Sequence, residues 1–405
     1  MAGEDPWRHP ANAAGRRRAA ADGSSPALVR PALTSSYRLA PYSDVVPYGQ
    51  VNSGRLLAIA AALAAATTLT SCAGAPGPRS EPRHVADRSQ SAPARLASPK
   101  TTGHPGAGAA PGVPLPRPAV LTPFGSGRPA RQGVWRAAGR PVHGVRAVYE
   151  TRLVPPGGRQ AAGIAWMDAR LLSARLYSGS LSPGGGPYRF TAPVAPAQAR
   201  TLVAAFNGGF KMKAAHGGYY TEGRTIDALR RGAASLVIYA NGNVAIGAWG
   251  SDGLVMSPAL ASVRQNLVML VSDGQPTHAA GGGCRSWGNT CGATSCAASV
   301  PGIKHQWRSG VGTTPDGALV YVVGPRLDPP QLARLLVRAG AVEGMQLDIN
   351  PFWPTFAAYD PASPHAAAAP HNGTKLLAGT AQGPATFFDP SWARDFITMS
   401  ARPAR

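Results

Sequence analysis

The sequence is poor in acidic residues and lacks long hydrophobic runs. Only 19 of its 405 residues are Asp or Glu against 40 Lys and Arg, a formal net charge of +21. This excess favours an anionic partner or surface, although Arg-rich coding from GC-rich DNA would produce it without any binding role. No uninterrupted apolar run reaches the roughly 20 residues of a spanning helix, which excludes a polytopic membrane protein.

Several well-known catalytic signatures are also missing. The sequence has no Walker loop, HExxH, GxSxG elbow or paired CxxC, so nucleotide hydrolysis, zinc proteolysis and α/β-hydrolase chemistry lose their best support. Nucleic-acid binding would rest on charge alone, without a reading helix or an aromatic and basic platform. We therefore expect no nucleic-acid partner, no metal site and no cofactor. The sequence does not decide whether a divalent cation assists any reaction.

An export signal is present instead. The apolar run Leu56–Thr70 follows Arg55 and ends beside Cys72, as in a secretory signal too short to span a bilayer. Leu69 to Cys72 are similar to a bacterial lipobox, which would lipidate Cys72 and tether the chain to the membrane. An Ala-rich cleavable signal with an incidental cysteine is the alternative. Residues 1–50 are then a disordered arm or lie before the true start, with Val51 as a possible initiator.

The organisation of the rest follows from composition. We expect residues 51–72 to be the signal peptide, residues 73–140 a disordered linker rich in Pro, Gly and Ala, and residues 141–405 one folded domain. The three remaining cysteines, Cys284, Cys291 and Cys296, lie in a Gly-rich loop. Their spacing fits no common zinc pattern, and we expect one disulfide among them in an oxidising compartment.

The pattern of the domain predicts an α+β fold with mixed, largely antiparallel sheets and flanking helices. Short apolar stretches punctuated by Gly and Pro predict strands, and Asn241-Gly242 predicts a hairpin. A second hairpin turns at Pro315-Asp316-Gly317. A helix is capped by Asp328 and stopped by Gly340, and it leads to a buried strand ending at Asp348. Another helix is expected from Ala195 into residues 202–206.

The order of three motifs resembles the phosphodiester glycosidase family. They are Ala205-Phe206-Asn207-Gly208-Gly209-Phe210, then Arg308-Ser309-Gly310-Val311-Gly312 before the second hairpin, then Gln346-Leu347-Asp348. The resemblance covers roughly residues 145–400 and implies a secreted α+β hydrolase that cleaves a sugar from a phosphodiester. After Asp348 the chain departs from the Gly-Gly-Gly-Ser turn of that family and continues as Ile349-Asn350-Pro351-Phe352-Trp353.

The chemistry of such a reaction suggests roles for these residues. Glycosidic cleavage normally uses two carboxyl groups, but a phosphate with a second pKa of about 6 leaves readily when cations hold it. We expect Asp348 to be the carboxylate, Arg308 the phosphate clamp with Arg264 as second candidate, and Asn207 a hydrogen-bonding partner. The remaining predicted substrate contacts are Gly208, Gly209, Phe210, Asp273 and Asn350.

Some of these residues have simpler explanations. Asn207 and its glycines could form a tight turn, Arg308 could be a surface charge, Asp348 a loop cap and Asp273 a turn residue. His216 and Lys211 could reach phosphate or face solvent, and Phe352, Trp353 and Phe356 could stack on sugars or belong to the core. His278, His305 and His371 have no assigned role.

The leading hypothesis is a membrane-tethered hydrolase of the cell envelope, on the outer face of the cytoplasmic membrane, acting on a phosphorylated glycan or sugar phosphodiester. The alternative is a non-catalytic glycan-binding module of the envelope, suggested by the altered segment after Asp348.

Overall fold

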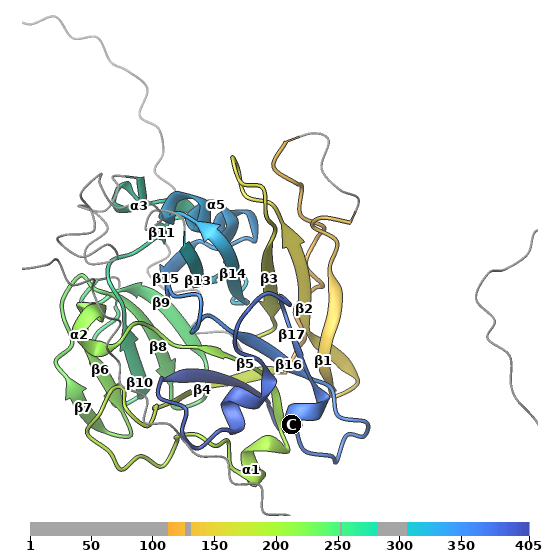
Figure 1. Cartoon of the computed structure of the whole chain (residues 1–405). Coiled ribbons are helices and arrows are strands. Elements are labelled where there is room, and N and C mark those ends of the chain that lie inside the picture. The colour runs from red at the N-terminus through yellow and green to blue at the C-terminus, as the bar shows by residue number, and fades with distance from the viewer. Residues whose placement is uncertain (1–111, 126–130, 252, 282–305, 405) are drawn as a thin grey trace, which may run out of the picture. The chain divides into compact units, whose positions relative to one another are not determined.

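The computed structural model describes residues 112–125, 131–251, 253–281 and 306–404. Within them the chain forms three antiparallel β-sheets (Figure 1). Largely antiparallel sheets, as the sequence predicts, are therefore confirmed. The expected lipidation site Cys72, the three loop cysteines and His305 lie outside the described residues.

The largest sheet has eight strands in the order β1-β2-β3-β14-β13-β15-β11-β12. The hairpin predicted at Pro315-Asp316-Gly317 joins β13 to β14, with Gly317 at a φ of 92°. The strands are β1 (Arg136–Val142), β2 (Val145–Leu153), β3 (Ala162–Met167), β11 (Val271–Ser272), β12 (Gln275–Pro276), β13 (Gln306–Thr313), β14 (Leu319–Leu327) and β15 (Glu343–Gln346).

A five-stranded sheet, β17-β16-β5-β18-β4, corrects one expectation. The helix expected from Ala195 is only α1 (Pro196–Ala199), and residues 202–207 form strand β5 (Leu202–Asn207). All six β5 residues are buried, and the apolar side chains among them belong to two hydrophobic cores, so the apolar run that suggested a helix face is a strand covered on both faces. Its companions are β4 (Leu172–Tyr177), β16 (Phe356–Tyr359), β17 (Gly373–Lys375) and β18 (Phe396–Ala401).

The third sheet also has five strands, in the order β7-β6-β10-β8-β9. Its β8-β9 hairpin turns through Asn241-Gly242 as predicted, because Gly242 adopts a φ of 77° that suits a tight turn. The strands are β6 (Tyr219–Thr221), β7 (Arg224–Asp227), β8 (Ala234–Tyr239), β9 (Val244–Ala248) and β10 (Leu260–Gln265).

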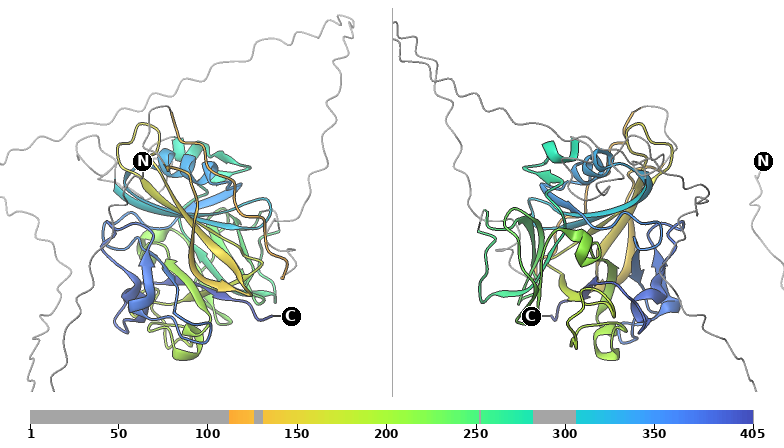
Figure 2. Two further views of the ribbon diagram at one scale, coloured as in Figure 1. Left: turned by 90° about the vertical axis from the view of Figure 1, so that its right-hand side faces the viewer. Right: turned by 60° about the vertical axis from the view of Figure 1, so that its left-hand side comes forward.

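Helices are few among the described residues, so the expected flanking helices are not confirmed. In the described chain, α5 (Pro329–Arg338) is the one α-helix longer than four residues, and it packs on the eight-stranded sheet (Figure 2). Asp328 caps it as predicted: Asp328 Oδ1 accepts from Gln331 N at 2.8 Å, and Gln331 Oε1 accepts from Asp328 N at 3.0 Å. The shorter helices are α1, α2 (Met212–Ala215), α3 (His278–Gly281) and the 3-10 turns η1 (Pro370–Asn372) and η2 (Pro384–Phe388).

The eight-stranded sheet separates two hydrophobic cores. Val311, Tyr321 and Met345 face the core shared with the five-stranded sheets, whereas Leu332 and Leu336 of α5 pack on the other face. Gly310 lies beneath the helix, since a Cβ there would meet Leu332 and Leu336 at 3.2 and 3.3 Å. Alternation along β13 therefore decides which of its side chains can reach each core.

The domain begins earlier than expected. The boundary placed at residue 141 falls inside β1, and Trp135 is buried just before that strand. Leu115 is also buried, and its backbone N donates to Asp168 Oδ2 at 2.8 Å. The end of the predicted linker is therefore part of the folded unit.

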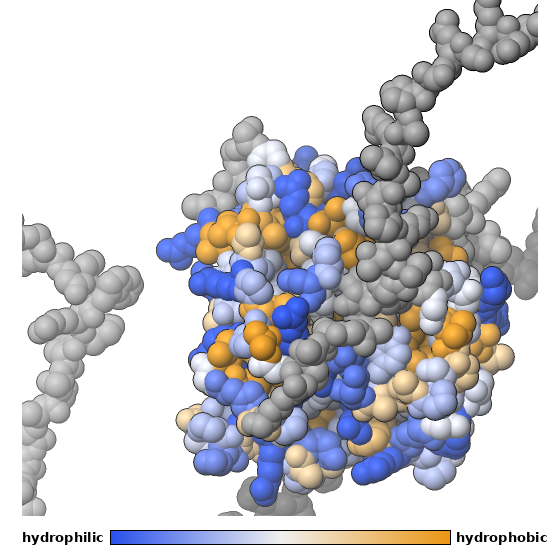
Figure 3. All heavy atoms as spheres, turned by 180° about the vertical axis from the view of Figure 1, so that it is seen from behind, coloured by the Kyte–Doolittle hydropathy of each residue, from blue (hydrophilic) through white to orange (hydrophobic). Residues whose placement is uncertain are grey.

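On the face opposite that of Figure 1, small groups of hydrophobic residues alternate with hydrophilic ones (Figure 3). Single exposed apolar residues are normal on protein surfaces. None of the helices in the described ranges is long and apolar enough to cross a membrane.

Candidate active site

Residues of the eight-stranded sheet and of the sheet that contains β5 meet around Asn207. This residue ends β5, Ser309 lies in β13, and Asp348 follows β15 by two residues. Arg394 and Asp395 directly precede β18, which pairs with β5 so that Phe396 is opposite Asn207. Figure 1 labels β5, β13 and β15, the strands that carry or precede Asn207, Ser309 and Asp348.

Asn207 organises the cluster through its amide. Oδ1 accepts from the Tyr321 hydroxyl at 2.7 Å and from Thr355 N at 3.1 Å, and Nδ2 donates to Gly208 O at 2.8 Å and Ser309 Oγ at 3.0 Å. These four bonds use the full capacity of a carboxamide. Asn207 therefore holds the strand ends in place, with no amide capacity left for a ligand.

Asp348 is connected to Asn207 through Ser309. The Ser309 hydroxyl accepts from Asp348 N at 3.2 Å, and Asp348 Oδ1 accepts from Ile349 N at 2.7 Å. Burial raises the pKa of Asp348 to about 6, although the Arg394 guanidinium and the Ile349 N–H oppose the shift. A carboxyl group with this pKa can exchange a proton near neutral pH.

Arg394 is the cation nearest to Asp348. Its Nη2 lies 3.1 Å from Asp348 Oδ2 and donates to Gly209 O at 2.6 Å, and its Cζ lies 5.1 Å from the Trp353 ring centroid. The guanidinium is buried, and Arg394 Nε lacks a hydrogen-bond partner within the described part of the chain. A buried, unpartnered donor beside a carboxylate is a feature of a binding site more than of a finished core.

A second buried ion pair, formed by Arg264 and Asp395, lies next to the pair of Arg394 and Asp348. Arg264 Nε lies 2.7 Å from Asp395 Oδ2, and both side chains are completely buried. Arg264 also donates through Nη1 to Gln265 O at 2.5 Å and through Nη2 to the Phe210 carbonyl. The structure therefore places Arg264 and Phe210 next to the cluster, with the guanidinium engaged by the protein itself.

The two glycines after Asn207 leave room for these side chains. A Cβ on Gly208 would lie 2.0 Å from Asp395 Oδ2, and one on Gly209 would lie 2.9 Å from Arg264 Cζ. Neither glycine is among those with positive φ, so close packing, not an unusual backbone conformation, requires glycine at both positions.

Arg308 lies on the other face of the eight-stranded sheet. Since Ser309 faces Asn207, the side chain of Arg308 points toward α5, where Nε donates to Leu327 O at 2.7 Å and Nη1 to Gln346 Oε1 at 2.9 Å. Burial lowers the pKa of Arg308 to about 10, and Asp328 opposes that shift. The structure therefore does not bring Arg308 together with Asp348.

The other predicted residues are more scattered. Asp273 lies in the β11-β12 turn beside Glu343, at the opposite end of β15 from Asp348. Asn350 is exposed close to Asp348, where its Oδ1 accepts from Phe352 N at 2.8 Å. His216 ends α2 in the left-handed conformation, His278 and His371 are exposed, and Lys211 precedes α2.

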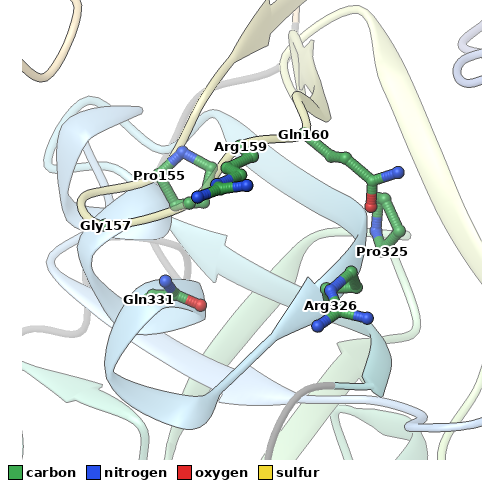
Figure 4. Close-up of a pocket in the computed structure, with 8 residues that line it drawn as sticks. Pro155, Gly157, Arg159, Gln160, Pro325, Arg326 and Gln331 are labelled. Atoms are coloured by element: carbon green, nitrogen blue, oxygen red, sulfur yellow. The ribbon is translucent and has the colours of Figure 1, made fainter.

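A hollow of about 200 Å³ lies on the α5 side of the domain (Figure 4). Figure 4 shows Arg159 and Arg326 among the residues that line it, from the loop after β2 and from the end of β14. No residue of the Asn207 cluster lines this hollow, so it is a separate feature.

Sequence reasoning missed Arg394, Asp395 and Tyr321. The only local signal for the first two is the adjacent pair of opposite charges before the apolar run of β18. Their partners are 46 and 131 residues away along the chain. Within the described ranges, no group of three His, Cys, Asp or Glu residues could hold a metal ion.

Comparisons with known proteins give only a distant fold resemblance. No family model and no curated protein matches the chain. The catalytic domain of zebrafish N-acetylglucosamine-1-phosphodiester alpha-N-acetylglucosaminidase, auto-inhibited by its pro-peptide, superposes with a TM-score of 0.40 and 16% identity over 65% of this chain and 87% of that chain. A hypothetical protein from Synechocystis gives a TM-score of 0.33 and 11% identity over 64% and 63%. Likenesses of this size do not define a family, so function has to be inferred from the site.

Proposed function

We propose that this protein is an exported, membrane-tethered hydrolase that cleaves a sugar from a glycosyl phosphodiester and leaves a phosphomonoester. The observation that supports this most is the buried pair of Asp348 and Arg394, with Arg394 Nε unpartnered in the described chain. It combines one carboxyl group of raised pKa with one permanent cation. These are the two groups that cleavage with a phosphate leaving group needs.

In this mechanism the bond between the anomeric carbon and the phosphate oxygen breaks, and its electron pair leaves with the phosphate. Asp348, in its ionised form, is the nucleophile or the base for water. Arg394 donates from Nε and its Nη atoms to the leaving phosphate, because a guanidinium matches two phosphate oxygens. Water supplies the new sugar hydroxyl, and its other proton goes to the phosphomonoester, or to solvent above the second phosphate pKa of about 6.

The remaining residues of the cluster act by positioning. Asn207 and Ser309 fix the backbone at Asp348. Asp395 forms an ion pair with Arg264, which packs against Gly209. We place Arg394 in the role that the sequence suggested for Arg308, because Arg308 points to the opposite face of its sheet.

The test is release of reducing sugar from a panel of alkyl hexose 1-phosphate diesters by the full chain. Asp348→Asn and Arg394→Ala should each lower kcat/KM by at least a hundredfold, measured at a temperature where the melting curve of each variant shows it to be folded, because breaking a buried pair also lowers stability. The matched control is the exposed ion pair of Arg146 and Asp360, 2.9 Å apart, where Asp360→Asn and Arg146→Ala should retain activity. Equal turnover by wild type and both site variants would refute the proposal.

A non-catalytic glycan-binding role is the second candidate. It is favoured by the contact of Asp348 Oδ2 with the protein's own Arg394, which a substrate would have to share or displace. Binding of a phosphorylated glycan without turnover of any diester would support this alternative over the hydrolase.

A further inference from the structure

Three aromatic rings form a row beside the Asp348 and Arg394 pair, from the buried Trp392 through Trp353 to the exposed Phe352. The Phe352 and Trp353 ring centroids are 4.8 Å apart with nearly perpendicular planes, and Trp353 and Trp392 are 5.2 Å apart. Phe352 is 45% exposed, and it is the only exposed aromatic residue in the described chain. The row therefore ends in a ring that solvent can reach.

This row is tied directly to the charged pair. The guanidinium of Arg394 lies over the Trp353 ring, with Cζ 5.1 Å from the centroid. A cation over an aromatic face is attracted by the ring quadrupole, so Trp353 orients Arg394. The bond from Phe352 N to Asn350 Oδ1 fixes the backbone that carries the outer ring. The Phe352 ring therefore lies next to the ring that the guanidinium covers.

We propose that Phe352 forms a stacking subsite for the sugar ring of a ligand whose phosphate is held by Arg394. The inference rests on the proposed function for the phosphate contact and adds the class of ligand: a phosphorylated sugar with an accessible apolar ring face. An aromatic ring offers a large contact area and loses little rotamer entropy when it is covered. Convergence of one such ring with a few polar groups is the usual composition of a small-molecule site.

Trp353 has a different part in this arrangement. Arg394 lies over its ring, and the rings of Phe352 and Trp392 pack against it in T-shaped geometry. Trp353 is therefore a positioning residue and makes no direct contact with the sugar. The two neighbouring aromatic residues thus have different roles: Phe352 contacts the sugar, and Trp353 orients the Arg394 guanidinium.

The experiment measures binding of glucose 1-phosphate and of inorganic phosphate to the full chain by calorimetry. Phe352→Ala should weaken glucose 1-phosphate about tenfold, as expected for losing a stacking contact, and leave inorganic phosphate unchanged. Phe352→Tyr should bind both like the wild type. Met256→Ala is the matched control, because Met256 is 49% exposed and lies outside the cluster.

The outcomes separate this inference from the proposed function. Equal binding of glucose 1-phosphate by wild type and Phe352→Ala, or none by the wild type at millimolar concentration, would overturn the subsite even if the diesters are hydrolysed. A Phe352-dependent loss of sugar phosphate binding without any turnover would uphold the subsite and refute the hydrolase. An equal loss for both probes would also contradict the subsite, since the effect would then concern phosphate alone.

Discussion

At the scale of single residues, the Asp348 and Arg394 pair illustrates how burial and charge oppose each other. Removal of the carboxylate from water disfavours its charge, while the guanidinium 3.1 Å away favours it. The pKa of Asp348 is raised to about 6, so the effect of burial is larger than that of the cation. The site therefore holds a carboxyl group that is ionised at neutral pH and protonated in mild acid.

The pH dependence of activity follows from that pKa. If Asp348 acts in its ionised form, kcat/KM should rise through about pH 6 and level off above it. Arg394→Gln should move this limb to higher pH, because the lost cation no longer favours the carboxylate. A profile of kcat/KM against pH for both proteins tests this, and a limb that stays in place in the variant would contradict it.

The glycine after Asn207 makes a prediction about stability. Gly208→Ala should lower the free energy of unfolding by about 1–3 kcal/mol, the usual effect of overpacking, because the new Cβ would lie 2.0 Å from Asp395 Oδ2. Chemical denaturation measures the change. Gly379→Ala is the control, since a Cβ there would be 3.4 Å from Trp307, an ordinary contact. Equal stability of the two variants would argue against this packing.

The residues of the cluster were only partly predictable. Asn207 and Asp348 stand at the ends of apolar runs, a position that marks them in the sequence. Arg308 was assigned to the site because it belongs to the same motif as Ser309, yet adjacent residues in a strand face opposite sides. Nothing local indicates which of the two side chains faces Asn207.

At the scale of secondary structure, Asp328 has two effects, one as the cap of α5 and one as a negative charge. This residue accepts from Gln331 N and also contributes a charge near Arg308. Asp328→Ala should lower stability by about 0.5–2 kcal/mol through the lost cap alone. Asp328→Asn should lose less, because an asparagine still caps a helix. Thermal unfolding of both variants tests this, and an equal loss would show that the charge matters more than the cap.

Elements with strong local signals were predicted well, and those without were not. The Asn241-Gly242 hairpin and the capped α5 depend on residues that are neighbours in sequence. The run at residues 202–206 carries no such signal, because a short apolar stretch fits a buried strand as well as a helix. Only its pairing with β16 and β18 makes it a strand.

At the scale of the whole molecule, we expect Cys72 to determine location. If the proposed lipidation occurs, Cys72→Ala should move the protein from the membrane fraction of a bacterial host to the soluble fraction, because the lipid on this residue would provide the anchor. Fractionation with immunodetection measures this, and Cys284→Ala should leave the distribution unchanged. A wild-type protein found entirely in the soluble fraction would contradict the tether.

The order of strands within the sheets is the part of the molecule least accessible from sequence. β5 pairs with β16 and β18, strands well over a hundred residues further along the chain. Contacts of that separation depend on the packing of the whole domain, for which a single sequence contains no pattern.

The position of β18 has a consequence for synthesis. This strand lies inside its sheet, and the two residues before it supply Arg394 and Asp395 to the site. The ribosome makes these residues well over a hundred residues after β5, and β5 stays without one of its partners until they emerge. A nascent chain can therefore assemble its hairpins early, but it can complete the charged cluster around Asn207 only after β18 has been made.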